Sequence, residues 1–350
     1  MLLVGLLCAS TVACGNSSKA KAKPDAAAGH DGGDAAGLDD AAADGRAGDA
    51  VDATDATSSD GDGDTDASAD AASGDATDAP SGDVVAAIDA GVGCMPPADD
   101  TALSAAAEGL PADGLVLWVR GDRGVYKMAD DTVCGWRDQV SSSRLLHAST
   151  SRPTWQGASV GGQAAIHFNV VGDDLYTDPL GILATSARTF IAVSQLASAT
   201  GRFHPILQGQ GNSAGTYIGI DANTWQTVGS REGVYVTNNS YDSATTTITT
   251  APRIHVLTLS TLALGTAVMT ALDYRIDGAT QTLTLKAGDG TIADFSAADF
   301  TTVGAVSGTP SAGVTTGDGF VAEALIYNRA LTLVERAAVE AVLKARYGIQ

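Results

Sequence analysis

The chain has 350 residues, a formal net charge of −21 and an aromatic content of only 5%. The charge is concentrated near the N-terminus: residues 15–113 contain 22 acidic and 4 basic side chains, whereas residues 114–350 contain 19 acidic and 16 basic ones. The nearly balanced C-terminal part therefore offers no broad basic surface for anionic partners, and we predict no nucleic-acid partner.

The first 13 residues are apolar or small, and Cys14 follows them. Residues 11–14, T-V-A-C, resemble a bacterial lipobox, in which a signal peptidase cuts before a cysteine that then carries lipid. The apolar run is too short for a membrane span, which takes roughly 20 residues. We predict a signal peptide over 1–13 and lipidation of Cys14, and hence an extracytoplasmic protein anchored to the bacterial membrane or cell surface. The alternative is an ordinary secretory signal that is cut near Ala9 or Ala13.

Residues 14–93 are predicted to form a disordered tether. Between 24 and 89 they are almost entirely Asp, Ala, Gly, Ser and Thr, with no aromatic side chain. Such a segment cannot bury enough apolar surface to offset an ordering cost of about 1–2 kcal/mol per residue. Roughly 80 flexible residues span about 50 Å on average, so we expect a spacer that holds a folded domain away from the membrane.

The cysteines predict one crosslink. If Cys8 leaves with the signal peptide and Cys14 carries lipid, then Cys94 and Cys134 remain, and an exported chain can oxidise them. We predict a disulfide between Cys94 and Cys134 that joins the entrance of the folded domain to its body. Two free thiols are the alternative.

Residues 94–350 are predicted to form one all-β domain. Large apolar residues come in short runs that are separated by turn-forming residues, a pattern typical of a sandwich. Asp277 and Gly278 lie between two alternating runs and predict a tight hairpin turn. The predicted strands lie at 115–119, 164–168, 189–193, 217–220, 254–259, 268–276, 280–286 and 320–327.

One helix is predicted at the C-terminus. Thr332 and Glu335 match a capping box, in which each side chain accepts a free backbone N–H group of the first turn. Apolar residues between 339 and 343 then share one face, and Gly348 marks the end. We expect this helix to pack across a sheet edge or one end of the sandwich.

Several motifs come in a recognisable order. The pattern G-L-x-L-W-x-x-x-D begins at Gly114, W-x-D follows at 136–138, and R-P-T-W at 152–155. A final strand, the triplet A-L-T and a helix ending in K-x-R-Y-G occupy 320–348. In this order and spacing, residues 111–350 resemble the laminin-G-like, concanavalin A-like jelly-roll domains of bacterial surface proteins. The resemblance implies a jelly-roll sandwich with a C-terminal helix.

The resemblance leaves several activities open, because domains of this fold bind carbohydrates or proteins, some with calcium, and others are hydrolases. Laminarinase-like hydrolases carry E-x-D-x-E on a strand. No such pattern occurs here, and we predict no catalytic residue. A G-x-S-x-G string at 211–215 precedes a predicted strand, whereas a nucleophile elbow needs a helix there. The glutamates after residue 114 are Glu232, Glu323, Glu335 and Glu340, of which we interpret Glu323 as structural.

Two groups of residues are candidates for a sugar site, because such sites combine an aromatic platform with amide and carboxylate groups. Trp225 with Asn223 forms one group, and Tyr235 with Asn238 and Asn239 forms the other. The alternative is packing for the aromatic rings and turn formation for the asparagines.

Calcium is the only cofactor that we consider. Asp173 and Asp174, beyond the predicted strand 164–168, are its candidate ligands, and turn formation is again the alternative. The histidines at 147, 167, 204 and 255 lack the spacing of metal ligands.

The functional hypothesis is an exported, lipid-anchored surface protein whose β-sandwich binds a carbohydrate or a surface protein. Its alternatives are a structural envelope protein without a specific ligand and, in third place, a glycoside hydrolase.

Overall fold

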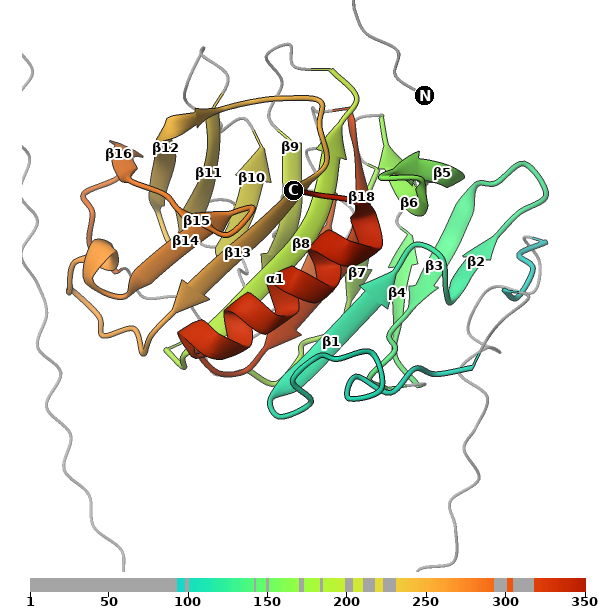
Figure 1. Cartoon of the computed structure of the whole chain (residues 1–350), viewed down its shortest axis with the longest axis horizontal. Coiled ribbons are helices and arrows are strands. Elements are labelled where there is room, and N and C mark those ends of the chain that lie inside the picture. Colours follow the sequence, from blue (N-terminus) through green and yellow to red (C-terminus); the bar gives the residue numbers. More distant parts are fainter. Residues whose placement is uncertain are drawn as a thin grey trace, which may run out of the picture. The chain divides into compact units, whose positions relative to one another are not determined.

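A computed structural model describes most of the C-terminal domain. The described residues are 93–97, 101–141, 143–148, 151–169, 173–182, 185–198, 204–209, 218–222, 231–292, 301–304 and 318–350. The predicted signal peptide, Cys14 and the tether up to residue 92 lie outside them. Two antiparallel sheets pack face to face and a C-terminal helix covers one of them (Figure 1), so the predicted jelly-roll sandwich is confirmed.

The eight-stranded sheet contains β1 (Leu115–Arg120), β5 (Thr154–Val160), β6 (Gln163–Phe168), β8 (Arg188–Leu196), β13 (Arg253–Leu259), β14 (Leu272–Ile276), β15 (Ala279–Thr280) and β18 (Gly319–Tyr327). Its order is β15-β14-β13-β8-β18-β6-β5, and β1 also pairs with β18. The central strands β8 and β18 are buried along nearly their whole length, which explains their continuous apolar sequences.

The ten-stranded sheet contains β2 (Val125–Lys127), β3 (Val133–Arg137), β4 (Leu145–Ala148), β7 (Leu175–Thr177), β9 (His204–Gly209), β10 (Ile218–Ala222), β11 (Arg231–Val236), β12 (Asn239–Thr247), β16 (Leu283–Ala287) and β17 (Thr301–Val303). Its order is β16-β12-β11-β10-β9-β17-β7-β4-β3-β2. Neighbouring strands far apart in sequence, such as β17 between β7 and β9, bring distant segments onto one face.

Helix α1 (Leu333–Tyr347) lies on the outer face of the eight-stranded sheet (Figure 1), rather than at an edge or end as the sequence suggested. Val339, Leu343 and Tyr347 pack against apolar residues of β8, β13 and β18. The predicted capping box is present, and the helix ends at Gly348 with φ of 64°. Within the described part of the chain, no helix has the length and apolar character that crossing a membrane requires.

Two of the predicted strands are wrong in extent. The run 268–276 divides into a 3₁₀ helix (Val268–Thr270) and strand β14. The run 280–286 divides between β15 and β16, which belong to different sheets. Alternation of apolar residues continues across both breaks, so the sequence carries no mark of the point at which the chain leaves one sheet for the other.

The hairpin turn at Asp277 and Gly278 is confirmed. These residues have φ of 51° and 89°, and they join β14 to β15 with Ile276 opposite Ala279. Positive φ at both central positions is the geometry that favours Asn or Asp followed by Gly.

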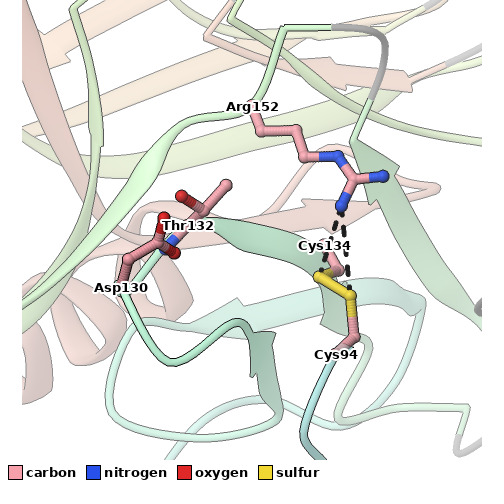
Figure 2. Close-up of a disulfide and its surroundings, with 5 residues drawn as sticks. All are labelled: Cys94, Asp130, Thr132, Cys134 and Arg152. Atoms are coloured by element: carbon pink, nitrogen blue, oxygen red, sulfur yellow. Dashed lines mark hydrogen bonds between the residues drawn. A yellow bond between two sulfur atoms is a disulfide. The ribbon is translucent and has the colours of Figure 1, made fainter. Parts of the chain in front are cut away.

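The Cys94–Cys134 disulfide is confirmed, and the sequence separation of the two cysteines is 40. Figure 2 shows that it joins the entering chain to strand β3, next to Arg152. The Nη1 atom of Arg152 lies 3.5 Å from Sγ of Cys134 and 4.0 Å from Sγ of Cys94. A backbone bridge between Met95 and Lys127 holds the same segment.

The motifs on which the family resemblance rests form hydrogen bonds that join separate segments of the sandwich. In the first motif, Trp118 donates its backbone N–H to Asp138 of the W-x-D motif at 2.9 Å and its indole N–H to Glu323 at 2.7 Å. The indole of Trp136 donates to the carbonyl of Arg120 at 2.7 Å. These residues therefore hold the sandwich together.

Candidate functional site

The outer face of the ten-stranded sheet carries a line of polar and aromatic residues. Residues paired directly across antiparallel strands lie on the same face. The pairing therefore places on one face a set that we call the polar row: His147, Tyr176, Thr302, Gln208, Gly219, Tyr235 and Ser240. The alternate residues, including Leu207, Ile220 and Val234, enter the core between the sheets. The polar row consequently points away from that core.

Gln208 and Asp221 form the centre of this face. The side-chain amide of Gln208 donates to Oδ1 of Asp221 at 3.1 Å, and both residues are almost completely buried. Gly219 makes room for this contact, since a Cβ atom there would lie 2.6 Å from Cγ of Gln208. The local sequence thus fixes an amide and a carboxylate beside each other.

Partly exposed rings flank this centre. Tyr235 lies on β11, and burial together with the nearby Asp221 carboxylate raises the pKa of its phenol, which therefore stays protonated as a hydrogen-bond donor. On the other side, the ring centroids of His147 and Tyr176 are 6.2 Å apart. Burial lowers the pKa of His147, opposed by Asp178, so the imidazole is neutral at pH 7.

The far end of the face is held by polar contacts. Asp242 lies opposite Gly233 on β11, and Nζ of Lys286 is 3.9 Å from its Oδ2 atom. The amide of Asn239 donates to the carbonyl of Thr291 at 2.7 Å and accepts the backbone N–H of Gly290 at the same distance. Asn239 is therefore a structural residue that fixes the β11–β12 turn.

The structure places only some of the candidate sugar-site residues on this face. Tyr235 belongs to the polar row, and Asn238 is exposed in the turn that follows β11. Trp225 and Asn223 fall in the segment between β10 and β11, which lies outside the described residues. The structure brings Tyr235 together with a Gln208–Asp221 pair that the sequence analysis did not identify.

A sequence signal for that pair exists. Ile218 and Ile220 alternate with Gly219 and Asp221, which places Asp221 on the face opposite the core. The same alternation occurs on the eight-stranded sheet, whose outer face the helix covers. Only the packing of α1 shows which of the two outer faces the helix covers.

The candidate calcium ligands lie apart from this face. Asp173 accepts the hydroxyl of Ser151 at 2.8 Å and the backbone N–H of Asn169 at 3.1 Å, and Asp174 is fully buried. Across the described ranges, no group of three or more His, Cys, Asp or Glu residues is arranged to hold a metal ion. Calcium binding by Asp173 and Asp174 remains a prediction.

The four glutamates after residue 114 have structural surroundings. Glu323 is buried beneath α1, Glu335 caps that helix, and Glu340 pairs with Arg275 at 3.1 Å. Glu232 shares the interior face of β11 with Val234, and its Oε1 atom is 3.7 Å from Nε of Arg253. None of these four carboxylates belongs to the polar row.

Glu232 gives the domain a measurable pH dependence. Burial raises the pKa of Glu232 from 4.5 to about 7. Its contribution to stability is therefore complete below about pH 4.5 and is lost as the pH rises through about 7, a change of about 3 kcal/mol. We expect the wild-type protein to lose that stability relative to Glu232→Gln between about pH 5 and pH 8, as measured by urea denaturation.

The matched control is Asp130→Asn, which changes an exposed carboxylate. In this variant the free energy of unfolding should depend on pH over this range as it does in the wild-type protein. Parallel stability curves for the wild-type protein and Glu232→Gln over this range would contradict the expectation.

No protein-family profile and no curated protein sequence matches the chain. Among solved structures, Trypanosoma rangeli sialidase in complex with the inhibitor DANA is similar at a TM-score of 0.44 and 14% identity, over 70% of this chain and 35% of that one. The binding domain of botulinum neurotoxin serotype D is similar at a TM-score of 0.39 and 9% identity, over 65% and 52% of the two chains. This chain spans about a third of the sialidase. Similarity at this level carries no inference about function.

Proposed function

We propose that the chain is an exported, lipid-anchored surface protein whose β-sandwich binds a carbohydrate on the outer face of the ten-stranded sheet. The observation that carries this proposal is the grouping of Tyr235 and Tyr176 around the Gln208–Asp221 pair. Aromatic rings offer a surface for the C–H face of a sugar. The Gln208–Asp221 pair is almost completely buried, so its part is to hold the strands that carry the two rings.

The two faces of the sandwich support this assignment. Helix α1 fills the outer face of the eight-stranded sheet with an apolar interface, so that face contributes to stability. The outer face of the ten-stranded sheet carries hydrogen-bonding groups and partly exposed rings instead. Rigid strands also position these groups more precisely than loops would.

The proposal of export and anchoring rests on the sequence before residue 94. The lipobox-like segment ending at Cys14 supports attachment to a membrane, and the acidic tether supports presentation of the sandwich at a distance from it. The Cys94–Cys134 disulfide is compatible with an oxidising compartment outside the cytoplasm.

Binding to a glycan array, followed by calorimetry on the best oligosaccharide, tests the proposal. We expect Tyr235→Ala and Tyr176→Ala each to weaken binding at least tenfold, which corresponds to about 1.4 kcal/mol. Each variant removes a partly exposed ring of the polar row, whereas Gln208 and Asp221 are almost completely buried between the two rings.

The matched control is Phe320→Ala. Phe320 is a half-buried ring on β18 in the other sheet, where it stacks on His167 with 4.3 Å between centroids. This variant should bind like the wild-type protein. If wild-type protein binds no glycan, with or without calcium, the carbohydrate proposal fails and the structural envelope role replaces it.

A further inference from the structure

One arginine side chain lies against both sulfur atoms of the disulfide. Figure 2 shows the guanidinium of Arg152 directed at the bond between Cys94 and Cys134. Its Nη1 atom is 3.5 Å from Sγ of Cys134 and 4.0 Å from Sγ of Cys94. A fixed positive charge is therefore held beside the disulfide, and it is closer to one sulfur atom than to the other.

The charged residues of strand β2 and of the loop that follows it have partners of their own. Asp130 accepts the backbone N–H of Thr132 at 3.1 Å. Lys127 pairs with Asp131, and its Nζ atom lies 3.5 Å from the ring centroid of Trp155. Arg152 is therefore the residue that brings positive charge to the sulfur atoms.

The two cysteines have different surroundings. Cys134 is only 8% exposed and lies in strand β3, where it packs with the buried Tyr126. Cys94 is partly exposed and directly precedes the backbone bridge between Met95 and Lys127. An incoming molecule therefore reaches Cys94 more readily, whereas Cys134 is the cysteine closer to the guanidinium.

This asymmetry matters for thiol–disulfide exchange. In that reaction a thiolate attacks one sulfur atom, and the other sulfur leaves with the electron pair of the broken S–S bond. A thiolate in apolar surroundings is costly unless a cation stabilises it. Attack on the accessible Cys94, with Cys134 leaving beside Arg152, meets both requirements.

We propose that Cys94 is a site of modification by small thiols, which form a mixed disulfide with it while Arg152 stabilises the Cys134 thiolate that leaves. The new S–S bond joins the sulfur of the small thiol to Sγ of Cys94, and the bond between Cys94 and Cys134 breaks. One thiolate is consumed and one is released, so the step needs no other oxidant or reductant. The inference does not depend on the proposed carbohydrate binding.

The geometry also makes the modification reversible. After the exchange, the entering chain is still held on β2 by the backbone bridge between Met95 and Lys127. The thiolate of Cys134 therefore stays next to the mixed disulfide on Cys94. Its attack on Sγ of Cys94 releases the small thiol and restores the crosslink.

Reduced glutathione is the probe for the experiment, added in excess to the folded full chain after free thiols have been blocked. Iodoacetamide then traps the released thiol, and mass spectrometry of the peptides locates both groups. We expect glutathione on Cys94 and the alkyl group on Cys134. Arg152→Gln should form this product about tenfold more slowly, because the leaving thiolate loses a nearby positive charge. Arg152→Lys keeps the charge and should recover part of the rate.

The matched control is Lys286→Gln, which removes a positive charge from β16 at the opposite edge of the same sheet and should leave the rate unchanged. A variant that only loosened the fold would exchange faster, so slower exchange has the sign that destabilisation does not produce. In urea-unfolded protein, Arg152→Gln and the wild-type protein should exchange at equal rates.

Three outcomes would overturn the inference. If the folded wild-type protein forms no mixed disulfide, the modification site is ruled out. If glutathione is found mainly on Cys134, the assignment of the leaving sulfur is wrong. If folded Arg152→Gln exchanges at least as fast as the wild-type protein, the role of Arg152 is wrong.

Discussion

Glu323→Ala should destabilise the domain by about 3–5 kcal/mol, because it removes one partner of a buried ion pair. Glu323 is fully buried on β18, and both of its oxygens accept from Nη1 of Arg346, at 2.7 and 2.6 Å. It also accepts the indole N–H of Trp118 at 2.7 Å and the hydroxyl of Tyr347 at 3.0 Å. Alanine would leave the buried indole and phenol without their shared acceptor, and the half-buried guanidinium with Glu108 alone. Urea denaturation of the full chain measures the loss.

Two further variants make this expectation specific. Arg346→Ala combined with Glu323→Ala should cost less than the sum of the single losses, because the pair is then removed together. Asp113→Ala, at a carboxylate whose side chain is 90% exposed beside Arg329, should cost far less. A loss for Glu323→Ala no larger than that of Asp113→Ala would contradict the role of Glu323 in joining α1 to the eight-stranded sheet.

Loss of the Cys94–Cys134 disulfide should lower the free energy of unfolding by about 4 kcal/mol. The crosslink closes a loop of 40 residues in sequence separation, and removing it restores the chain entropy of the unfolded state. We expect the Cys94→Ser, Cys134→Ser double variant to unfold at a correspondingly lower urea concentration than the wild-type protein.

Reduction supplies the matched control. Dithiothreitol should bring the wild-type protein to the stability of the double variant and should leave the double variant unchanged. If reduction changes the wild-type curve by less than about 1 kcal/mol, the unfolded-state account fails for this crosslink. The proposed saccharide binding should persist in both forms at low denaturant, because neither cysteine belongs to the polar row.

The predictions that depend only on neighbouring residues were confirmed. The capping box of α1 and the turn at Asp277 and Gly278 depend on neighbouring residues only, and both are found as predicted. The disulfide followed from accounting for the other cysteines. The prediction of one strand over 280–286 was wrong, because alternation of side chains is the same in both sheets. Only long-range pairing assigns β15 to one sheet and β16 to the other.

In the candidate site, too, the sequence indicated single residues and strand pairing decided which residues meet. Tyr235 was visible in the sequence as an aromatic residue near asparagines, but Gln208 and Asp221 were not, because 13 positions separate them and their contact depends on the pairing of β9 with β10. Glu323 could be interpreted as structural, yet its partners come from β1 and from α1.

The sequence by itself determined the all-β class of the domain, its helix, its crosslink and the expectation of an exported, tethered chain, since these depend on composition and on short-range spacing. The tertiary structure decided which outer face of the sandwich α1 covers and which residues meet on the other outer face. The physical reason is that each strand presents two faces, and a strand's own alternation does not state which face a distant helix will cover. Here α1 covers the eight-stranded sheet, and the polar row of the ten-stranded sheet becomes the candidate surface for a ligand.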